Sequence, residues 1–237
     1  MSLRPVLSHG ADLLARQSPW IGGGRCVSLT VNDRPCWRRV VKRGQRCTHC
    51  WRRLVVSPTT SHRVELAAEP DLPAWVTTLL VEDPEPMVRM VVAGRFDIAA
   101  EFLRRLGGDP DPGVRSALAD NESLPADVAV RLAADPDSDI VIRLAARPGV
   151  ARAVLAGLGH HSDARVRGAL AGNTGADEHL DRTLASHEID PVVLAALAAK
   201  TTTSALVLTW LAQHPAPLVA EPAARQLRTR SAQEGVA

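Results

Sequence analysis

The chain has 237 residues, of which 46% are hydrophobic and 23% are charged, a globular balance that argues against intrinsic disorder. The net charge of +2 is unevenly spread, since 12 Lys and Arg against two Asp occur up to Arg63 and the remainder is acidic. No run approaches the roughly 20 apolar residues of a membrane span, and residues 1–17 lack the apolar core of a secretion signal, so we expect a cytoplasmic protein without a membrane segment.

Residues 1–53 are predicted to form a basic module with four cysteines, separated by intervals of nine, ten and two residues. In a reducing compartment, thiolates so closely spaced favour ligation of a metal ion or an iron–sulfur cluster over disulfides. The predicted ligands are Cys26, Cys36, Cys47 and Cys50. A Zn²⁺ ion and a four-iron cluster would leave the same residual charge, which nearby arginines compensate, so electrostatics leaves both open.

The tetrapeptide Cys-Trp-Arg-Arg occurs twice in this module and supports two interpretations. In the first, the tryptophans stack on bases and the arginines contact phosphates of a nucleic acid. In the second, the tryptophans shield the cysteine centre and pack against the first repeat, while the arginines balance its charge. The residues concerned are Trp37, Arg38, Arg39, Trp51, Arg52 and Arg53.

From residue 54 to about residue 225 the sequence repeats with a period of 26 residues, the signature of a solenoid. Four apolar columns recur without any insertion up to residue 220. One column is Leu54, Leu80, Leu106, Leu132, Leu158 and Leu184, continued by Trp210. A second is Val88, Val114, Ile140, Val166, Val192 and Leu218. A third column, in which each residue is followed by Ala, is Leu66, Val92, Leu118, Leu144 and Leu170. The fourth is Val76, Phe102, Val128, Val154, Leu180 and Leu206.

Each repeat is predicted to contain two short helices, because apolar residues at i and i+4, such as Val114 and Leu118, lie on one helix face. Asp-Pro pairs such as Asp109–Pro110 supply a turn and a start for the first helix. Leu-Pro pairs such as Leu124–Pro125 start the second. Such short helices depend on stacking between neighbouring repeats, so we expect an all-α solenoid of about six repeats.

Segments such as residues 106–121, LGGDPDPGVRSALADN, and residues 132–138, LAADPDS, resemble the leucine-rich repeat variant family. The resemblance covers about residues 54–223 and implies a right-handed superhelix of alternating α- and 3₁₀-helices. Some members carry an N-terminal four-cysteine domain that binds a [4Fe-4S] cluster. The resemblance therefore implies that Cys26, Cys36, Cys47 and Cys50 hold such a cluster, with Zn²⁺ as the alternative.

Arginines recur six residues after the Asp column, at Arg63, Arg89, Arg115 and Arg167. They could form a row of cations for phosphates, but the accompanying acids favour a ladder of Asp–Arg pairs between repeats. Later repeats depart from the pattern, since His161–Ser162 and His187–Glu188 replace Asp-Pro. We read His160 and His161 as surface substitutions and expect partner contacts around them and around residues 188–190. Residues 226–237 form a polar tail that is expected to fray.

No nucleotide-binding loop, dinucleotide fingerprint or His-Glu-x₂-His motif is present, so no catalytic residues are predicted. Solenoids present long surfaces that hold other macromolecules. We therefore predict a non-enzymatic scaffold for a protein partner, with an iron–sulfur or zinc module at its N-terminus. The alternatives are a nucleic-acid-binding or redox-responsive regulator that uses the cysteine module, and an electron-transfer component.

Overall fold

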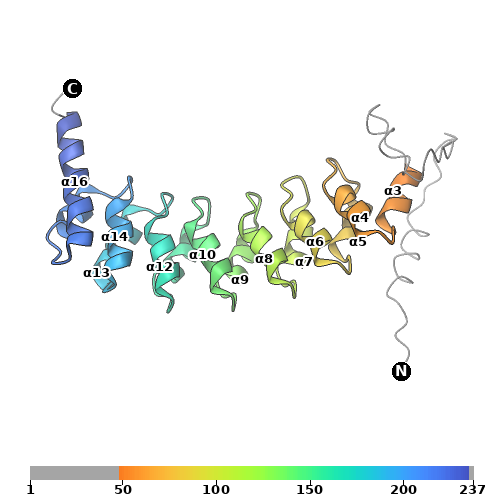
Figure 1. The fold of residues 1–237 in the computed structure, drawn as a ribbon, viewed down its shortest axis with the longest axis horizontal. Coiled ribbons are helices and arrows are strands. Elements are labelled where there is room, and N and C mark those ends of the chain that lie inside the picture. The colour runs from red at the N-terminus through yellow and green to blue at the C-terminus, as the bar shows by residue number, and fades with distance from the viewer. Residues whose placement is uncertain (1–47, 235–237) are drawn as a thin grey trace. The chain divides into compact units, whose positions relative to one another are not determined.

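The computed structural model describes residues 48–234, and within this range it contains fourteen α-helices and no strand. The described helices fall into two compact units, divided between Ile98 and Ala99. The first unit contains α3 (Thr48–Val55), α4 (Thr60–Ala67), α5 (Ala74–Val81) and α6 (Pro86–Ala93). Figure 1 shows these helices in orange to yellow. The predicted all-α repeat architecture is confirmed for this part of the chain.

The second unit runs from α7 to α16 and contains most of the repeats. Its helices are α7 (Ala100–Leu106), α8 (Pro112–Ala119), α9 (Ala126–Leu132), α10 (Ser138–Ala146), α11 (Arg152–Leu158), α12 (Ala164–Ala171), α13 (Glu178–His187), α14 (Pro191–Ala199), α15 (Ala205–Leu211) and α16 (Pro217–Glu234). Even-numbered helices pack in series, α8 on α10, α10 on α12, α12 on α14 and α14 on α16 (Figure 1). Odd-numbered helices lie beside them, so each repeat contributes one helix to each row.

The odd-numbered helices of the second unit are α-helical, which corrects the expected alternation with 3₁₀-helices for the described residues. Their N–H groups bond four residues back, as in Gly107 N to Leu103 O at 3.0 Å and Ala133 N to Ala129 O at 2.9 Å. Their buried residues are spaced by four, as Val128 and Leu132 are. This spacing needs the ~3.6-residue period of an α-helix to keep both side chains on one face.

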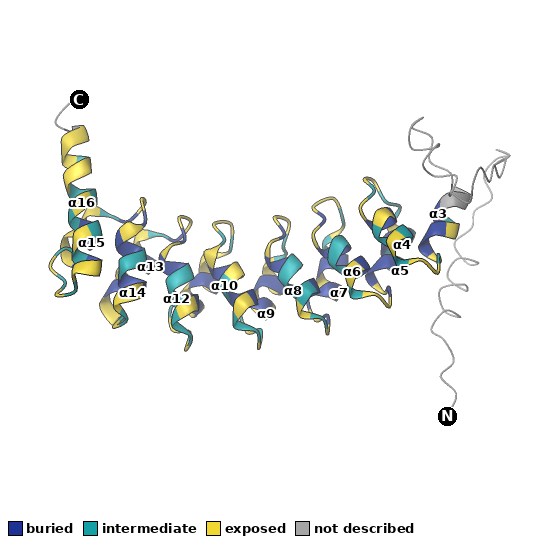
Figure 2. Ribbon diagram, in the orientation of Figure 1, coloured by how far each residue is buried: buried dark blue, intermediate teal, exposed yellow. Residues whose placement is uncertain are grey.

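The predicted core columns are buried through Leu184, so the 26-residue period correctly identifies the inward faces of the helices up to that point. Figure 2 shows the buried residues in dark blue, in segments that recur from helix to helix along the described chain. Beyond Leu184 the prediction is wrong by one residue. Val192, Leu206, Trp210 and Leu218 are exposed, and the buried residues are their successors Val193, Val207, Leu211 and Val219.

The cause of this shift is one extra residue near the end of α13. The N-cap residues of the even-numbered helices recur at the repeat period up to Asp163. Asp190, the N-cap residue of the next even-numbered helix, comes one position later than that period places it. After the insertion the original spacing resumes, since Val193 and Val219 are both fully packed. The expectation of an uninterrupted 26-residue period up to residue 220 is therefore wrong, because the chain contains one extra residue after Leu184.

The helix starts are held by two successive side-chain caps. In the second unit, Asp109 Oδ1 accepts the Asp111 N–H at 2.9 Å, and Asp111 Oδ1 accepts the N–H groups of Gly113 and Val114. The Asp of the Asp-Pro pair thus shapes the turn, and the N-cap is the acid two residues later. Helix α8 begins at Pro112, not at Pro110 as the pattern suggested.

A ladder of arginine–acid pairs joins consecutive repeats, as the structural interpretation of the arginine column predicted. Arg63 Nε and Nη2 donate to both oxygens of Asp83, and Arg63 Nη1 donates to Ser57 O. Arg115 pairs in the same way with Asp135, at 2.7 and 3.1 Å, and with Asp109 O. These guanidinium groups are committed to structure, so they do not form a free row of cations.

A second column of polar side chains donates hydrogen bonds to carbonyl groups at the ends of the preceding even-numbered helices. Asn173 Nδ2 donates to Ala145 O and Arg147 O, and Gln226 Nε2 donates to Ala198 O and Lys200 O. Lys200 lies between them in the column and donates to Asn173 O. These bonds satisfy helix-terminal carbonyls that would otherwise be buried without a donor.

The polar tail does not fray over most of its length, which corrects the expectation for residues 226–234. Helix α16 continues to Glu234 because Gln226 and Arg230 bond back to the preceding repeat. Arg230 Nη1 donates to Thr203 O at 2.8 Å, and its Nη2 donates to Thr201 O at 2.7 Å. Residues 235–237 lie outside the described range.

Candidate functional site

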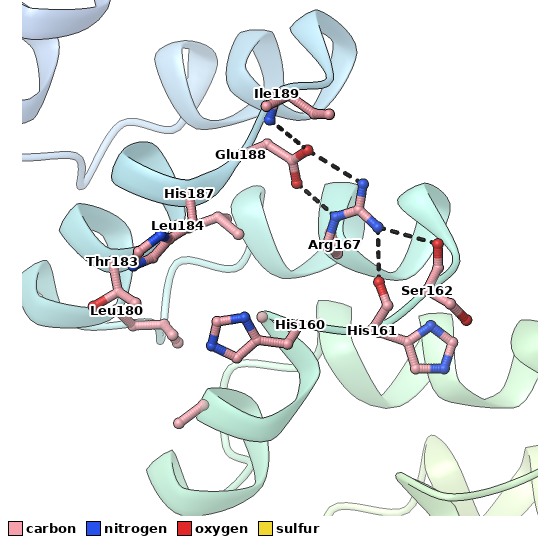
Figure 3. A pocket seen from close by; sticks show the side chains of 12 residues that line it. His160, His161, Ser162, Arg167, Leu180, Thr183, Leu184, His187, Glu188 and Ile189 are labelled. Carbon is pink, nitrogen blue, oxygen red and sulfur yellow. Dashed lines mark hydrogen bonds and ion pairs between the residues drawn. The ribbon is translucent and has the colours of Figure 1, made fainter.

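A pocket of about 290 Å³ opens in the second unit between the loop after α11 and the loop after α13. Figure 3 shows the side chains that line it. They are Ala156, Gly159, His160, His161, Ser162, Arg167, Leu180, Thr183, Leu184, His187, Glu188 and Ile189. The pocket lies where the Asp-Pro pattern fails, at the position from which partner contacts were expected.

One side of the pocket lies at a repeat position that holds a long side chain in an earlier repeat and a short one here. Two repeats earlier, Arg131 Nη1 donates to Arg104 O and lies 3.4 Å from an ideal Cβ on Gly107, so it covers that loop. Thr183 occupies the position of Arg131 in its own repeat, and its Oγ1 donates to His179 O of the same helix at 2.8 Å. Thr183 therefore does not reach across, and the loop at Gly159 and His160 is left uncovered.

His160 and His187 contribute imidazole rings to the pocket from neighbouring repeats. Their ring centroids are 6.2 Å apart, with an angle of 53° between the ring planes. Both residues are exposed, and neither ring has a hydrogen-bond partner among residues 48–234. In Figure 3 the two rings lie on the same side of the pocket, whereas the His161 ring is turned away from them.

His161 belongs to the ladder and not to this ring pair. Its Nδ1 accepts the Asp163 N–H at 3.1 Å, as the Asp side chains do in other repeats. The Nδ1 atom must be unprotonated to accept, so the ring carries its proton on Nε2. The start of α12 is regular although His161–Ser162 replaces Asp-Pro, since Asp163 is the N-cap residue and the helix begins at Ala164.

The sequence explains why a histidine replaces the acid here. A ladder arginine pairs with an acid at the start of the next repeat, as Arg167 does with Glu188. Two repeats carry Val141 and Leu194 in the arginine column and so offer no guanidinium to an acid. In the repeat after each of them the acid is replaced by a histidine, His161 or His214. Both histidines keep the cap function, since His214 Nδ1 accepts the Ala216 N–H at 3.1 Å.

Arg167 and Glu188 form the wall of the pocket beside His161. Arg167 Nε lies 2.6 Å from Glu188 Oε2 and Nη2 lies 3.2 Å from Oε1, while Nη1 donates to the carbonyls of His161 and Ser162. Glu188 Oε1 also accepts the N–H groups of Ile189 and Asp190. Every polar atom of this pair is engaged, so the pair shapes the pocket without offering a free charge.

The ion pair changes how both groups titrate. Burial opposes ionisation of Glu188, but the bonds from Arg167 and the two N–H groups outweigh it and hold the pKa of Glu188 below its ordinary value. The hydrogen bond to Glu188 raises the pKa of Arg167. The pair is therefore charged throughout the physiological range.

Apolar residues form the remaining walls of the pocket. Leu180 and Leu184 are buried core residues of α13, and Ile189, at the rim, is 90% exposed. The pocket therefore combines an apolar floor, two imidazoles and an ion-paired wall.

The residues predicted for the cysteine module lie mostly outside the described range. These are Cys26, Cys36, Cys47, Trp37, Arg38 and Arg39. Cys50 belongs to α3, at whose end Arg52 and Arg53 lie. Trp51 is buried in this helix, which favours packing against the first repeat over base stacking for this tryptophan. No group of three or more His, Cys, Asp or Glu side chains suited to a metal ion occurs among the residues that the structure describes.

Sequence reasoning identified His160, His161 and residues 188–190 but missed His187 and Thr183 as parts of one pocket. The signal was present in the columns. Position 183 follows Arg105, Arg131 and Gly157 in one column of the repeat, so the loss of the covering arginine is visible in the sequence. His187 was harder to place, because its match to His160 needs the one-residue insertion.

None of the described helices combines the length and apolarity that crossing a bilayer requires. Comparison of the sequence with protein-family models and with curated proteins finds no match.

Proposed function

We propose that the chain is a non-enzymatic scaffold that holds a protein partner, with the histidine pocket of the second unit as a contact site. One observation carries this proposal. At the pocket the regular array of ion pairs lacks one member, since Val141 replaces the arginine and His161 the acid, and the pocket opens beside the exposed Ile189. Elsewhere in the second unit, ladder groups such as Arg115 and Asp135 bind each other and stabilise the stack.

The dimensions of the pocket suit a side chain of a partner. Its volume of about 290 Å³ is at the lower end of the range of small-molecule sites, roughly 300–1,000 Å³. A partner side chain inserted against Leu180 and Leu184 would bury apolar surface, and Ile189 would extend that contact. Repeat proteins commonly bind partners along an array of such positions.

The partner experiment compares three forms of the full chain in affinity capture from the native host. The wild type is expected to recover a protein in stoichiometric amount, and Ile189→Asp is expected to lose it. Val130→Asp is the control, because Val130 is also an exposed branched residue of the second unit and does not line the pocket. Equal recovery by both variants would place the contact elsewhere, and recovery of nucleic acid alone would contradict a protein partner.

We further propose that the N-terminal module holds a [4Fe-4S] cluster, with Zn²⁺ as the alternative, and that the protein acts in the cytoplasm. The support is the donor set of Cys26, Cys36, Cys47 and Cys50, since four thiolates suit either centre and are kept reduced in that compartment. These side chains lie outside the described set. Anaerobic purification followed by metal analysis tests the assignment, since iron with inorganic sulfide supports a cluster and one zinc per chain overturns it.

A further inference from the structure

His160 and His187 occupy the same position in consecutive repeats once the extra residue of α13 is counted. The two preceding repeats of the second unit carry Gly108 and Ala134 at this position. Small residues there leave no side chains to interact, whereas two consecutive histidines face each other at the spacing of the stack. The periodicity of the fold thus brings together two potential ligands from neighbouring repeats.

The distance between the rings is slightly longer than the distance that ligation of one shared ion requires. A zinc–imidazole bond is about 2.0–2.1 Å long, and each ring nitrogen lies about 1 Å from its ring centre, so a shared ion places the centroids roughly 5–6 Å apart. The observed separation is 6.2 Å. Both side chains are exposed and neither ring has a hydrogen bond within the described residues, so neither burial nor such a bond opposes rotation of the rings toward a shared ion.

The neighbouring groups do not compete for this role. His161 Nδ1 accepts the Asp163 N–H, and both oxygens of Glu188 accept hydrogen bonds from Arg167. The guanidinium of Arg167 is neutralised by Glu188, so it does not impose an unbalanced positive charge on a nearby cation. His160 and His187, by contrast, have no hydrogen bond that fixes either ring within the described residues.

We propose that His160 and His187 form a two-imidazole site for a borderline divalent transition-metal ion of the Zn²⁺ or Ni²⁺ class. Neutral imidazole is a preferred ligand of these ions. Two protein ligands leave coordination positions for water or for an incoming donor group, as in open metal sites. The site is weaker than a four-ligand structural site, and it stands independently of the proposed partner function.

The test is a Zn²⁺ titration of the full ¹⁵N-labelled chain at about pH 7.5, where imidazole is ordinarily neutral. The readout is the imidazole ¹⁵N shift of each histidine, so zinc taken up by the N-terminal thiolates does not interfere. The rings of His160 and His187 are expected to shift together at the same Zn²⁺ concentration. His160→Ala should weaken the response of His187 at least tenfold, because chelation is lost.

His179→Ala is the matched control, because His179 is an exposed histidine on the same helix as His187. This variant should leave the paired response unchanged, and the backbone amide spectrum verifies that each variant is folded. The proposal would be overturned if the two rings shift independently of each other or if neither responds below millimolar Zn²⁺. It would also be overturned if the His187 response is unchanged in His160→Ala.

Discussion

Arg167 pairs with Glu188 across a sequence separation of 21, whereas the corresponding pair of Arg63 has a separation of 20. The longer glutamate side chain and the extra residue of α13 occur together in this repeat. Glu188 keeps both functions of the ladder acid, because it binds the arginine and accepts the Asp190 N–H. The ladder thus accommodates an insertion without losing its bonds.

Glu188→Gln tests the strength of this pair and its dependence on pH. At neutral pH we expect a loss of about 2–4 kcal/mol in the free energy of unfolding, because the Arg167 guanidinium loses its counter-charge in a largely buried position. The pKa of Glu188 is lowered in the folded state, so its contribution is present above the unfolded pKa, ordinarily about 4.3, and is lost as the pH falls through the folded value.

Urea unfolding of both proteins between neutral and acidic pH measures this effect. The difference between wild type and variant should shrink in acid. Asp139→Asn removes the acid of the exposed Arg165–Asp139 pair and is expected to change stability by less than about 1 kcal/mol. A difference for Glu188→Gln that stays constant into acid would show that the charge of Glu188 does not stabilise the fold.

A pair of leucines on α15 tests the register after the insertion. Leu206 is 63% exposed and Leu211 is fully buried, although the uninterrupted period places Leu206 in the core. Leu211→Ala should cost about 2–5 kcal/mol, and Leu206→Ala less than about 1 kcal/mol. Thermal or urea unfolding distinguishes them. A larger effect at Leu206 would restore the uninterrupted register and refute the insertion.

Lys200 and Asp181 form a buried ion pair. Removing one member is predicted to destabilise the fold strongly, whereas replacing both members with apolar residues is predicted to cost little. Lys200 Nζ donates to Asp181 Oδ1, and both side chains are almost inaccessible to solvent. Lys200→Ala should lose about 3–5 kcal/mol, because the carboxyl group is left buried without its partner. The double variant Lys200→Met with Asp181→Leu should recover most of this loss, since apolar side chains of similar size need no partner.

The pH dependence of Lys200→Ala gives an independent check. Burial raises the pKa of Asp181, and Lys200 offsets only part of that rise. A raised carboxyl pKa contributes stability at low pH that is lost as the pH rises through the folded value. Without Lys200 the destabilisation should therefore grow with rising pH in urea unfolding. A pH-independent loss would indicate that removal of packing, and not of charge, is responsible.

Gly175 is predicted to be a position where only glycine fits. A Cβ atom there would lie 2.2 Å from Pro148 O, which is backbone and cannot move aside. Gly175→Ala should destabilise by about 1–3 kcal/mol or more. Gly157→Ala is the control, because nothing lies within 4 Å and alanine favours the helix by up to about 1 kcal/mol. Melting temperatures should move in opposite directions, and equal shifts would exclude this steric explanation.

Sequence reasoning placed the helix faces correctly up to Leu184 because each repeat has one apolar stripe and the columns align without gaps. The apolar columns alone could not reveal the insertion, since both registers are apolar at the following positions, as in Val192–Val193 and Trp210–Leu211. Only packing distinguishes these neighbours, and packing buries the second of each pair. The signal for the insertion is Asp190, a cap residue one position later than the period places it.

The sequence indicated which region of the chain holds the candidate site, but not how its side chains are arranged. The replacement of Asp-Pro by His161–Ser162 marked this loop in the sequence. The histidine at position 161 goes with the absence of a ladder arginine at Val141 in the preceding repeat. The pocket lies beside Thr183, whose hydroxyl donates to His179 O of its own helix. The orientation of His160 toward His187 depends on how closely the repeats stack, which composition does not determine.

The carbonyl column of Asn173, Lys200 and Gln226 has a mechanical consequence for the second unit. Each of these residues closes the end of the preceding helix, so a repeat loses its closure when its C-terminal neighbour is pulled away. Under tension from the C-terminal end, the stack should therefore lengthen stepwise, and each released repeat of 26 residues supplies up to about 90 Å of extended chain. The second unit is therefore expected to extend under force one repeat at a time, and not in a single cooperative step.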